Sequence, residues 1–222
     1  MLPEQSSLAN LNSSSNKLSD HKIEVLNDFF QRLRNLENAI ARLSPLELYE
    51  AHWAILGIMS RSYQLMLCCI DQLARGNWNG FYAAARGLVE TLCAVVWVNE
   101  NTDRLPSLIQ TDSVRIGKLL NAGYKKYPDL EGMYSYLSGI THPNRNSHFL
   151  GPRPSNEWSE KGVWSPFNLS FSDFFANEKI DLLVQVGSRI MDELENLASG
   201  GAEVIKKGRI MTRLTTKKST EA

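Results

Sequence analysis

The most apolar stretch of the chain is residues 81–98, FYAAARGLVETLCAVVWV. Apolar residues fall on nearly every side of a helix drawn through it, which is typical of a helix at the centre of a bundle. The same stretch contains Arg86 and Glu90, which lie four residues apart and therefore on one face. Desolvation costs several kcal/mol for each buried ion. We therefore expect a central helix over residues 81–100 whose charged pair finds partners on neighbouring helices.

Two long helices are expected before this one. Residues 20–43 repeat apolar residues at helical spacing with charges opposite, which predicts an amphipathic helix on the outside of the bundle. Residues 44–47, SPLE, combine a serine cap, a proline at the first helical position and a closing glutamate. They predict the start of a second, mostly apolar helix that ends at Gly76. Because only a few residues separate Gly76 from the central helix, the two helices should be antiparallel neighbours.

Three further helices follow from the pattern in the second half of the chain. They are expected at residues 107–125, after Pro128 as far as Thr141, and at residues 173–199. Proline, glycine, asparagine and serine interrupt residues 144–172, where short apolar pieces favour at most a small hairpin. The sequence thus predicts an all-α, up-and-down bundle of about six helices with an irregular loop or small hairpin at 144–172.

Length and composition favour one domain with loose ends. The chain has 222 residues, 43% of them hydrophobic, and a formal net charge of zero, which argues against a strongly basic nucleic-acid binder. Residues 1–19 are rich in serine and asparagine and predict a disordered lead-in. Residues 201–222 predict a basic, disordered tail, which leaves residues 20–200 as the helical domain.

The cysteines and the ends of the apolar runs bear on location. Cys68, Cys69 and Cys93 are odd in number and lie in apolar helical stretches, so they predict reduced, buried thiols. Residues 1–20 lack the charged and apolar regions of a secretory signal. The longest unbroken apolar run is well short of the roughly 20 residues that span a membrane. We therefore expect a cytoplasmic protein with no membrane segment.

Two groups of residues are candidates for a site in the bundle. Arg86 and Glu90 form either a structural ion pair or the charged floor of a pocket for an anionic ligand. Tyr134, Ser138 and His142 follow at steps of four and share one helix face. His142 either caps the end of its helix or faces Arg86 and Glu90 across the bundle, where its imidazole could exchange a proton near neutral pH.

The segment that follows His142 is a third candidate. Arg145 and His148 lie close together, and such a pair can cleave RNA when one group moves a proton and the other stabilises the charge on phosphorus. An ordinary polar loop is the alternative. No carboxylate or cysteine lies at ligand spacing, so we expect no metal. We see no glycine-rich nucleotide loop or other catalytic signature, and we expect no cofactor.

Two short patterns carry a family resemblance. Residues 85–90, ARGLVE, and residues 137–144, LSGITHPN, resemble a group of bacterial helical proteins of unknown function with an Arg-x-x-x-Glu helix and a Ser-x-x-x-His segment. That group is similar to the HEPN (higher eukaryotes and prokaryotes nucleotide-binding) superfamily. The resemblance covers roughly residues 45–195.

The resemblance implies an all-α bundle, often a homodimer, and sometimes RNA cleavage in defence or toxin–antitoxin systems. Active HEPN proteins carry an arginine, four to six residues and then a histidine on a late helix. This sequence departs from that pattern, because only two residues separate Arg145 from His148 and a loop is expected there. Three functions therefore stay open: nucleotide or RNA binding in a polar pocket, a metal-independent ribonuclease, and a structural dimerisation module without a ligand.

Overall fold

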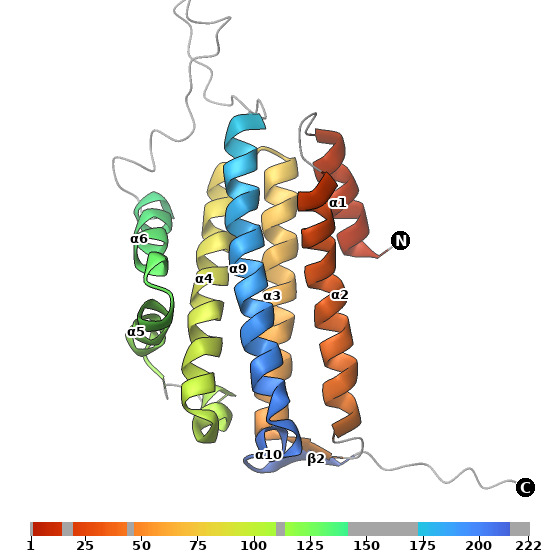
Figure 1. Ribbon diagram of the computed structural model, residues 1–222, viewed down its shortest axis with the longest axis vertical. Coiled ribbons are helices and arrows are strands. Elements are labelled where there is room, and N and C mark those ends of the chain that lie inside the picture. The colour runs from red at the N-terminus through yellow and green to blue at the C-terminus, as the bar shows by residue number, and fades with distance from the viewer. Residues whose placement is uncertain (1, 15–19, 44–46, 110–113, 142–172, 214–222) are drawn as a thin grey trace, which may run out of the picture.

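The computed structural model describes residues 2–14, 20–43, 47–109, 114–141 and 173–213. Within these residues the chain forms nine helices and one two-stranded sheet, so the predicted all-α class is confirmed with more helices than the six expected. Four long helices run side by side and form the body of the bundle (Figure 1). They are α2 (Asp20–Leu43), α3 (Glu50–Ala74), α4 (Trp78–Glu100) and α9 (Asp173–Ser199).

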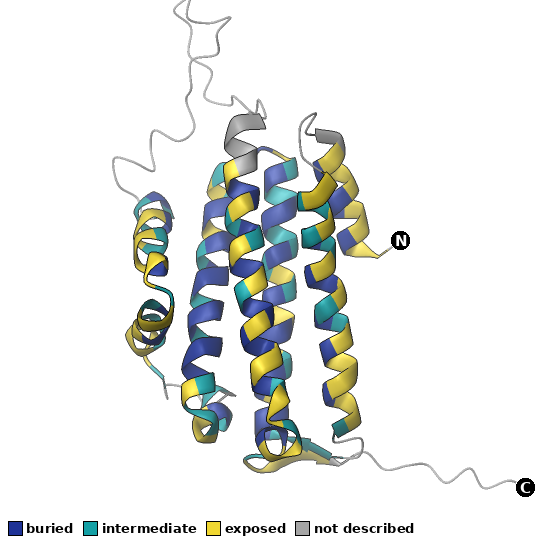
Figure 2. Ribbon diagram, viewed as in Figure 1, coloured by how far each residue is buried: buried dark blue, intermediate teal, exposed yellow. Residues whose placement is uncertain are grey.

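Helix α4 is the centre of the fold, as its sequence predicts. It packs against α3 and α9, and most of its residues are buried (Figure 2). A short turn connects it to α3, so the two helices are antiparallel neighbours. Gly76 has a φ of 66° in this turn. Asn77 caps α4 by accepting a hydrogen bond from the backbone nitrogen of Gly80 at 3.2 Å.

A helical hairpin covers the opposite side of α4 from α3. It comprises α5 (Ile116–Lys126) and α6 (Asp129–Thr141), and both helices pack on α4 (Figure 1). The helix predicted over 107–125 is therefore interrupted. A 3-10 helix, η1 (Thr102–Ile109), contains Pro106 and ends before residues 110–113, which lie outside the described part of the chain.

Residues 3–14 and 201–213, which were expected to be disordered, form helices and a strand, whereas residues 15–19 and 214–222 lie outside the described part of the chain. Helix α1 (Pro3–Ser14) packs on α3 and α2 and buries Glu4, Leu8 and Leu11. Sequence periodicity missed it because one of its three anchors is a charged residue. After α10 (Gly201–Ile205), strand β2 (Ile210–Arg213) is ordered as well.

Strand β2 also explains an error in the predicted start of α3. It pairs antiparallel with β1 (Glu47–Tyr49), so α3 begins at Glu50 and not at the expected proline cap. The backbone nitrogen of Glu50 donates to the carbonyl oxygen of Arg209 at 2.9 Å, which is a contact between residues far apart in the sequence. Residues 144–172, including the expected hairpin, lie outside the described residues.

Two of the described helices, α3 and α4, are long and apolar enough to cross a membrane, with mean hydropathies of 1.3 and 1.4. In these windows 44% and 78% of the residues are buried inside the fold. The core helices of a soluble protein pass the same test of length and composition. The burial of α4 among its neighbours is consistent with a soluble bundle (Figure 2).

Candidate functional site

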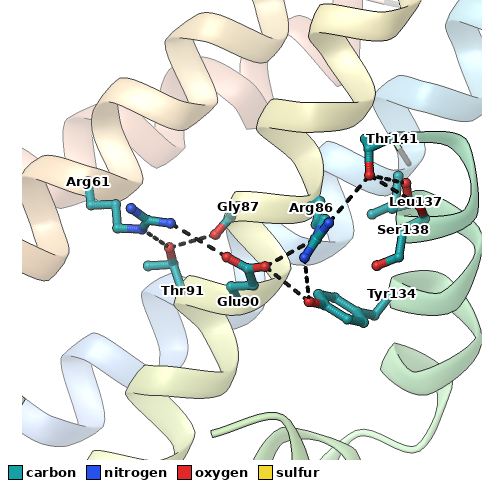
Figure 3. Close-up of polar contacts among 9 residues, drawn as sticks. All are labelled: Arg61, Arg86, Gly87, Glu90, Thr91, Tyr134, Leu137, Ser138 and Thr141. Atoms are coloured by element: carbon teal, nitrogen blue, oxygen red, sulfur yellow. Dashed lines mark hydrogen bonds and ion pairs between the residues drawn. The ribbon is translucent and has the colours of Figure 1, made fainter. Parts of the chain in front are cut away.

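Arg86 lies on α4, facing α6, and several side chains hold its guanidinium in place (Figure 3). Its Nε donates to Glu90 Oε1 at 3.1 Å, one helical turn along. Its Nη2 donates to the Tyr134 hydroxyl at 3.0 Å, and its Nη1 lies 3.4 Å from Thr141 Oγ1. The guanidinium carbon is also 5.2 Å from the centre of the Tyr134 ring, within the range of a cation–π contact. Arg86 is therefore a well-positioned cation.

Glu90 connects Arg86 to a second arginine, which comes from α3. The Nη2 of Arg61 lies 3.7 Å from Glu90 Oε2, and its Nε donates to Thr91 Oγ1 at 3.1 Å. Glu90 also accepts a hydrogen bond from the Tyr134 hydroxyl at 3.1 Å. Three helices thus place two guanidinium groups around one carboxylate (Figure 3).

This charged cluster lines an open cavity of about 340 Å³ between α3, α4 and the end of α6. Gly87 lets α3 and α4 approach closely at the cavity wall, because a Cβ there would lie 3.1 Å from both terminal methyl groups of Leu65. The side chain of Glu90 is 23% exposed, and Arg61 is exposed. The Arg86–Glu90 ion pair is therefore not sealed in the core. A purely structural ion pair would be enclosed there.

The environment keeps Arg86 charged. Partial burial by itself would lower the pKa of Arg86, but the hydrogen bond to Tyr134 and the charge of Glu90 outweigh that effect and raise the pKa. The cation is therefore present at any physiological pH. Cys93, one turn beyond Glu90, is inert by contrast, because burial and then the charge of Glu90 raise the pKa of its thiol to about 12.

Ser138 lies on the same helix as Tyr134 and Thr141 and faces the cluster with them (Figure 3). Its hydroxyl oxygen is buried and has no hydrogen-bond partner among the described residues. A buried hydroxyl without a partner is uncommon and requires an explanation. A ligand or a neighbouring segment that reaches this end of α6 would supply the missing partner.

Half of the predicted site residues can be placed. The structure brings Arg86, Glu90 and Ser138 to one junction of α4 and α6, whereas His142, Arg145 and His148 lie outside the described residues.

Sequence reasoning missed two residues of this cluster, Arg61 and Thr141. An available signal was that Arg61 is the only basic residue of α3 before Arg75. An isolated cation within a long apolar helix indicates a local partner or a function.

Metal ligands do not gather in the part of the chain that the structure describes, where no group of three or more histidine, cysteine, aspartate or glutamate side chains could hold an ion. The site is instead built from the guanidinium groups of Arg61 and Arg86, the Glu90 carboxylate and the hydroxyl groups that contact them. Guanidinium groups bind anions through charge and hydrogen bonds.

Comparison of the chain with protein-family models, with curated proteins and with solved structures finds no significant match. The functional argument therefore rests on the geometry of the cluster.

Proposed function

We propose that the cavity around Arg86 binds a phosphate group of a nucleotide or of RNA. The observation that supports this proposal is the pairing of two guanidinium groups with one carboxylate at an open cavity. Two positive charges against one negative charge leave an excess of one positive charge. The planar donors of arginine suit phosphate oxygens, which accept two parallel hydrogen bonds.

The residues of the cluster would have different roles. Arg86 is fixed by Glu90, Tyr134 and Thr141, so little conformational entropy is lost when it binds an anion. Arg61 is exposed, and its contact with Glu90 at 3.7 Å is long, so it can turn toward a ligand at small cost. Glu90 positions Arg86. Because its carboxylate would also repel the anion, binding would require Arg61 to turn from Glu90 toward the ligand.

The free cysteines support a cytoplasmic location for this binding domain. The described residues contain three free thiols, of which Cys69 and Cys93 are buried. Proteins of oxidising compartments usually pair such residues in disulfides. We therefore propose that the protein lies in the cytoplasm.

A binding experiment with two named probes tests the proposal. Fluorescence anisotropy of a fluorescein-labelled 12-nucleotide single-stranded RNA and calorimetry with ATP should each show saturable binding to the wild type. Arg61→Gln should weaken binding about tenfold, because one charge-assisted hydrogen bond contributes about 1.5–3 kcal/mol. The matched control is Arg42→Gln, which removes an exposed arginine at the end of α2. Absence of binding to both probes, or equal losses in the two variants, would contradict the proposal.

The same RNA samples test the ribonuclease alternative. That reading assigns cleavage to Arg145 with His148 or His142, without a metal. We would incubate the RNA with the wild type in EDTA and separate the products on a denaturing gel. Fragments that disappear with His148→Ala or His142→Ala would favour the enzyme, whereas intact RNA with retained binding favours a binding domain.

One observation favours the dimerisation alternative. Trp53 on α3 is 53% exposed, and Gly57 follows one turn later on the same face, with no atom within 4 Å of where its Cβ would lie. Glycine inside a helix costs roughly 0.5–1 kcal/mol relative to alanine, and no contact with another described residue explains it here. We propose this face of α3 as the seam of a homodimer. Sedimentation equilibrium should then show a dimer that Trp53→Ala converts to monomers.

A further inference from the structure

A second cavity, of about 480 Å³, lies on the other side of α3, where α1 and α2 meet it. It shares no lining residue with the cavity around Arg86. Its walls are mainly aliphatic and include Leu2, Leu33, Leu56 and Met59. Small-molecule sites have volumes of roughly 300–1,000 Å³ and mostly apolar walls with a few polar groups. The cavity has this character.

Two polar residues that line this cavity, Glu4 and Arg34, form an ion pair without net charge. Glu4 of α1 is 1% exposed, and its carboxylate accepts hydrogen bonds from Arg34 Nη1 of α2 and from the Tyr63 hydroxyl of α3, the latter at 2.7 Å. Burial would raise the pKa of Glu4, but Tyr63 and Arg34 outweigh it and hold the pKa below its usual value. The carboxylate is therefore charged and satisfies one half of the Arg34 guanidinium.

The other half of that guanidinium is unsatisfied. Arg34 Nη2 is buried and has no hydrogen-bond partner among the described residues. A buried donor without an acceptor destabilises the fold, so the fold gains stability if an acceptor is supplied. Arg34 is also one of the residues that line the cavity.

The remaining charge defines which acceptor would fit. Glu37 lines the cavity as well and forms no ion pair with any described residue. Because the Glu4–Arg34 pair is neutral, Glu37 leaves the cavity with an excess negative charge that repels anions. An uncharged acceptor such as a carbonyl group avoids this repulsion.

We propose that this cavity binds a small, uncharged, mainly apolar molecule with one carbonyl-type acceptor directed at Arg34. The apolar body of the ligand lies against Leu33, Leu56 and Met59. Because Leu2, which precedes α1, and Glu4 of α1 line the cavity, the ligand also strengthens the attachment of α1 to the bundle. Binding at this site is independent of the function proposed for the cavity around Arg86.

The probe for this proposal is Prodan, an uncharged naphthalene ketone whose fluorescence shifts to the blue in apolar surroundings. The full-length protein should bind it saturably at one site, with a blue shift and a rise in Tm. Leu56→Trp fills the cavity and should weaken binding at least about tenfold. Asn121→Trp adds the same side chain at an exposed position of α5, which does not line the cavity, and should leave binding unchanged.

Two further measurements test the polar part of the proposal. Arg34→Lys keeps the positive charge for Glu4 but removes the second guanidinium nitrogen, so it should weaken Prodan binding several-fold without loss of helicity. The anionic probe 1-anilinonaphthalene-8-sulfonate should bind more weakly than Prodan. The proposal is overturned if the wild type does not bind Prodan saturably, if the two tryptophan variants bind it equally, or if sedimentation shows that a second copy of the chain covers the cavity.

Discussion

Two carboxylates between helices, Glu90 and Glu193, have similar partners and very different surroundings. Each accepts a hydrogen bond from a tyrosine of the α5–α6 region, Tyr134 for Glu90 and Tyr127 for Glu193. Each also lies beside a basic side chain. Glu90 is 23% exposed at an open cavity, whereas Glu193 is 2% exposed.

Glu193 has the features of a structural lock. Its Oε1 accepts from the Tyr127 hydroxyl and pairs with Lys126 Nζ, both at 2.6 Å. Its Oε2 accepts from Asn99 Nδ2 at 2.7 Å. The three donors come from two other elements, α4 and α5 with its cap, so one carboxylate joins them to α9. Both carboxylate oxygens of Glu193 are thus occupied, and the group is almost fully buried.

The clusters around Glu90 and Glu193 contain the same kinds of residue. They differ in how far packing encloses the carboxylate, and this difference separates a ligand site from a structural lock. A carboxylate, a tyrosine and a cation occur in both clusters. Around Glu193 packing closes over the group, and around Glu90 the space between α3, α4 and α6 stays open. Four predictions test this distinction, from the largest expected effect to the smallest.

Removal of the enclosed carboxylate should have the largest effect on stability. Glu193→Ala should lower the free energy of unfolding by about 3 kcal/mol, the lower end for a broken buried pair, because Lys126 is 43% exposed and can be solvated. Glu90→Ala should cost less than about 1 kcal/mol, as expected for a partly exposed pair. Urea denaturation measures both values. Equal losses would show that the two clusters do not differ in role.

The close contact between Gly123 of α5 and Cys93 of α4 should affect the stability of the helix packing that holds both clusters. A Cβ at Gly123 would lie 2.9 Å from the Cβ of Cys93 and closer still to its sulfur. Gly123→Ala should therefore destabilise the protein by about 1–3 kcal/mol through overpacking. The control is Gly132→Ala on α6, where no atom lies within 4 Å and alanine should stabilise by roughly 0.5–1 kcal/mol.

The stability of the protein should fall in acid because of Glu193. Burial would raise the pKa of Glu193, but hydrogen bonds from Lys126, Tyr127 and Asn99 outweigh it and hold the pKa below the ordinary value of 4.5. The ionised form therefore stabilises the fold above the unfolded pKa, and this contribution is lost as the pH falls through the folded value. Urea denaturation between pH 7 and pH 3 measures the loss. Glu193→Gln should reduce the slope.

The smallest effect is expected from the tyrosine of the open cluster. Tyr134→Phe removes the hydroxyl that contacts Arg86 and Glu90 and should cost about 0.5 kcal/mol of stability, the low end for a hydrogen bond. Arg86 then becomes less well positioned, so RNA affinity should fall while the helical circular dichroism stays the same. Tyr127→Phe should show the reverse, with a larger loss of stability and no change in RNA binding.

Much of the bundle could be predicted from the sequence. The apolar run at residues 81–98 predicts a buried helix. Nearly every face of that helix is apolar, and exposing any of them to water would have a large cost. The positions of α2, α3 and α9 follow in the same way from apolar residues at helical spacing, and the i, i+4 spacing determines that Arg86 and Glu90 share a face.

Tertiary contacts decided what local patterns could not. Strand β1 forms because β2, more than 150 residues later, offers backbone partners. Helix α1 packs on the bundle because Arg34 and Tyr63 donate hydrogen bonds to its buried Glu4. Glu90 lies at an open cavity and Glu193 is enclosed by its partners. This difference depends on where α3, α5 and α6 meet α4. Spacing along one helix determines which side chains share a face, but the partner of that face depends on how separate helices pack, and only the folded chain determines that packing.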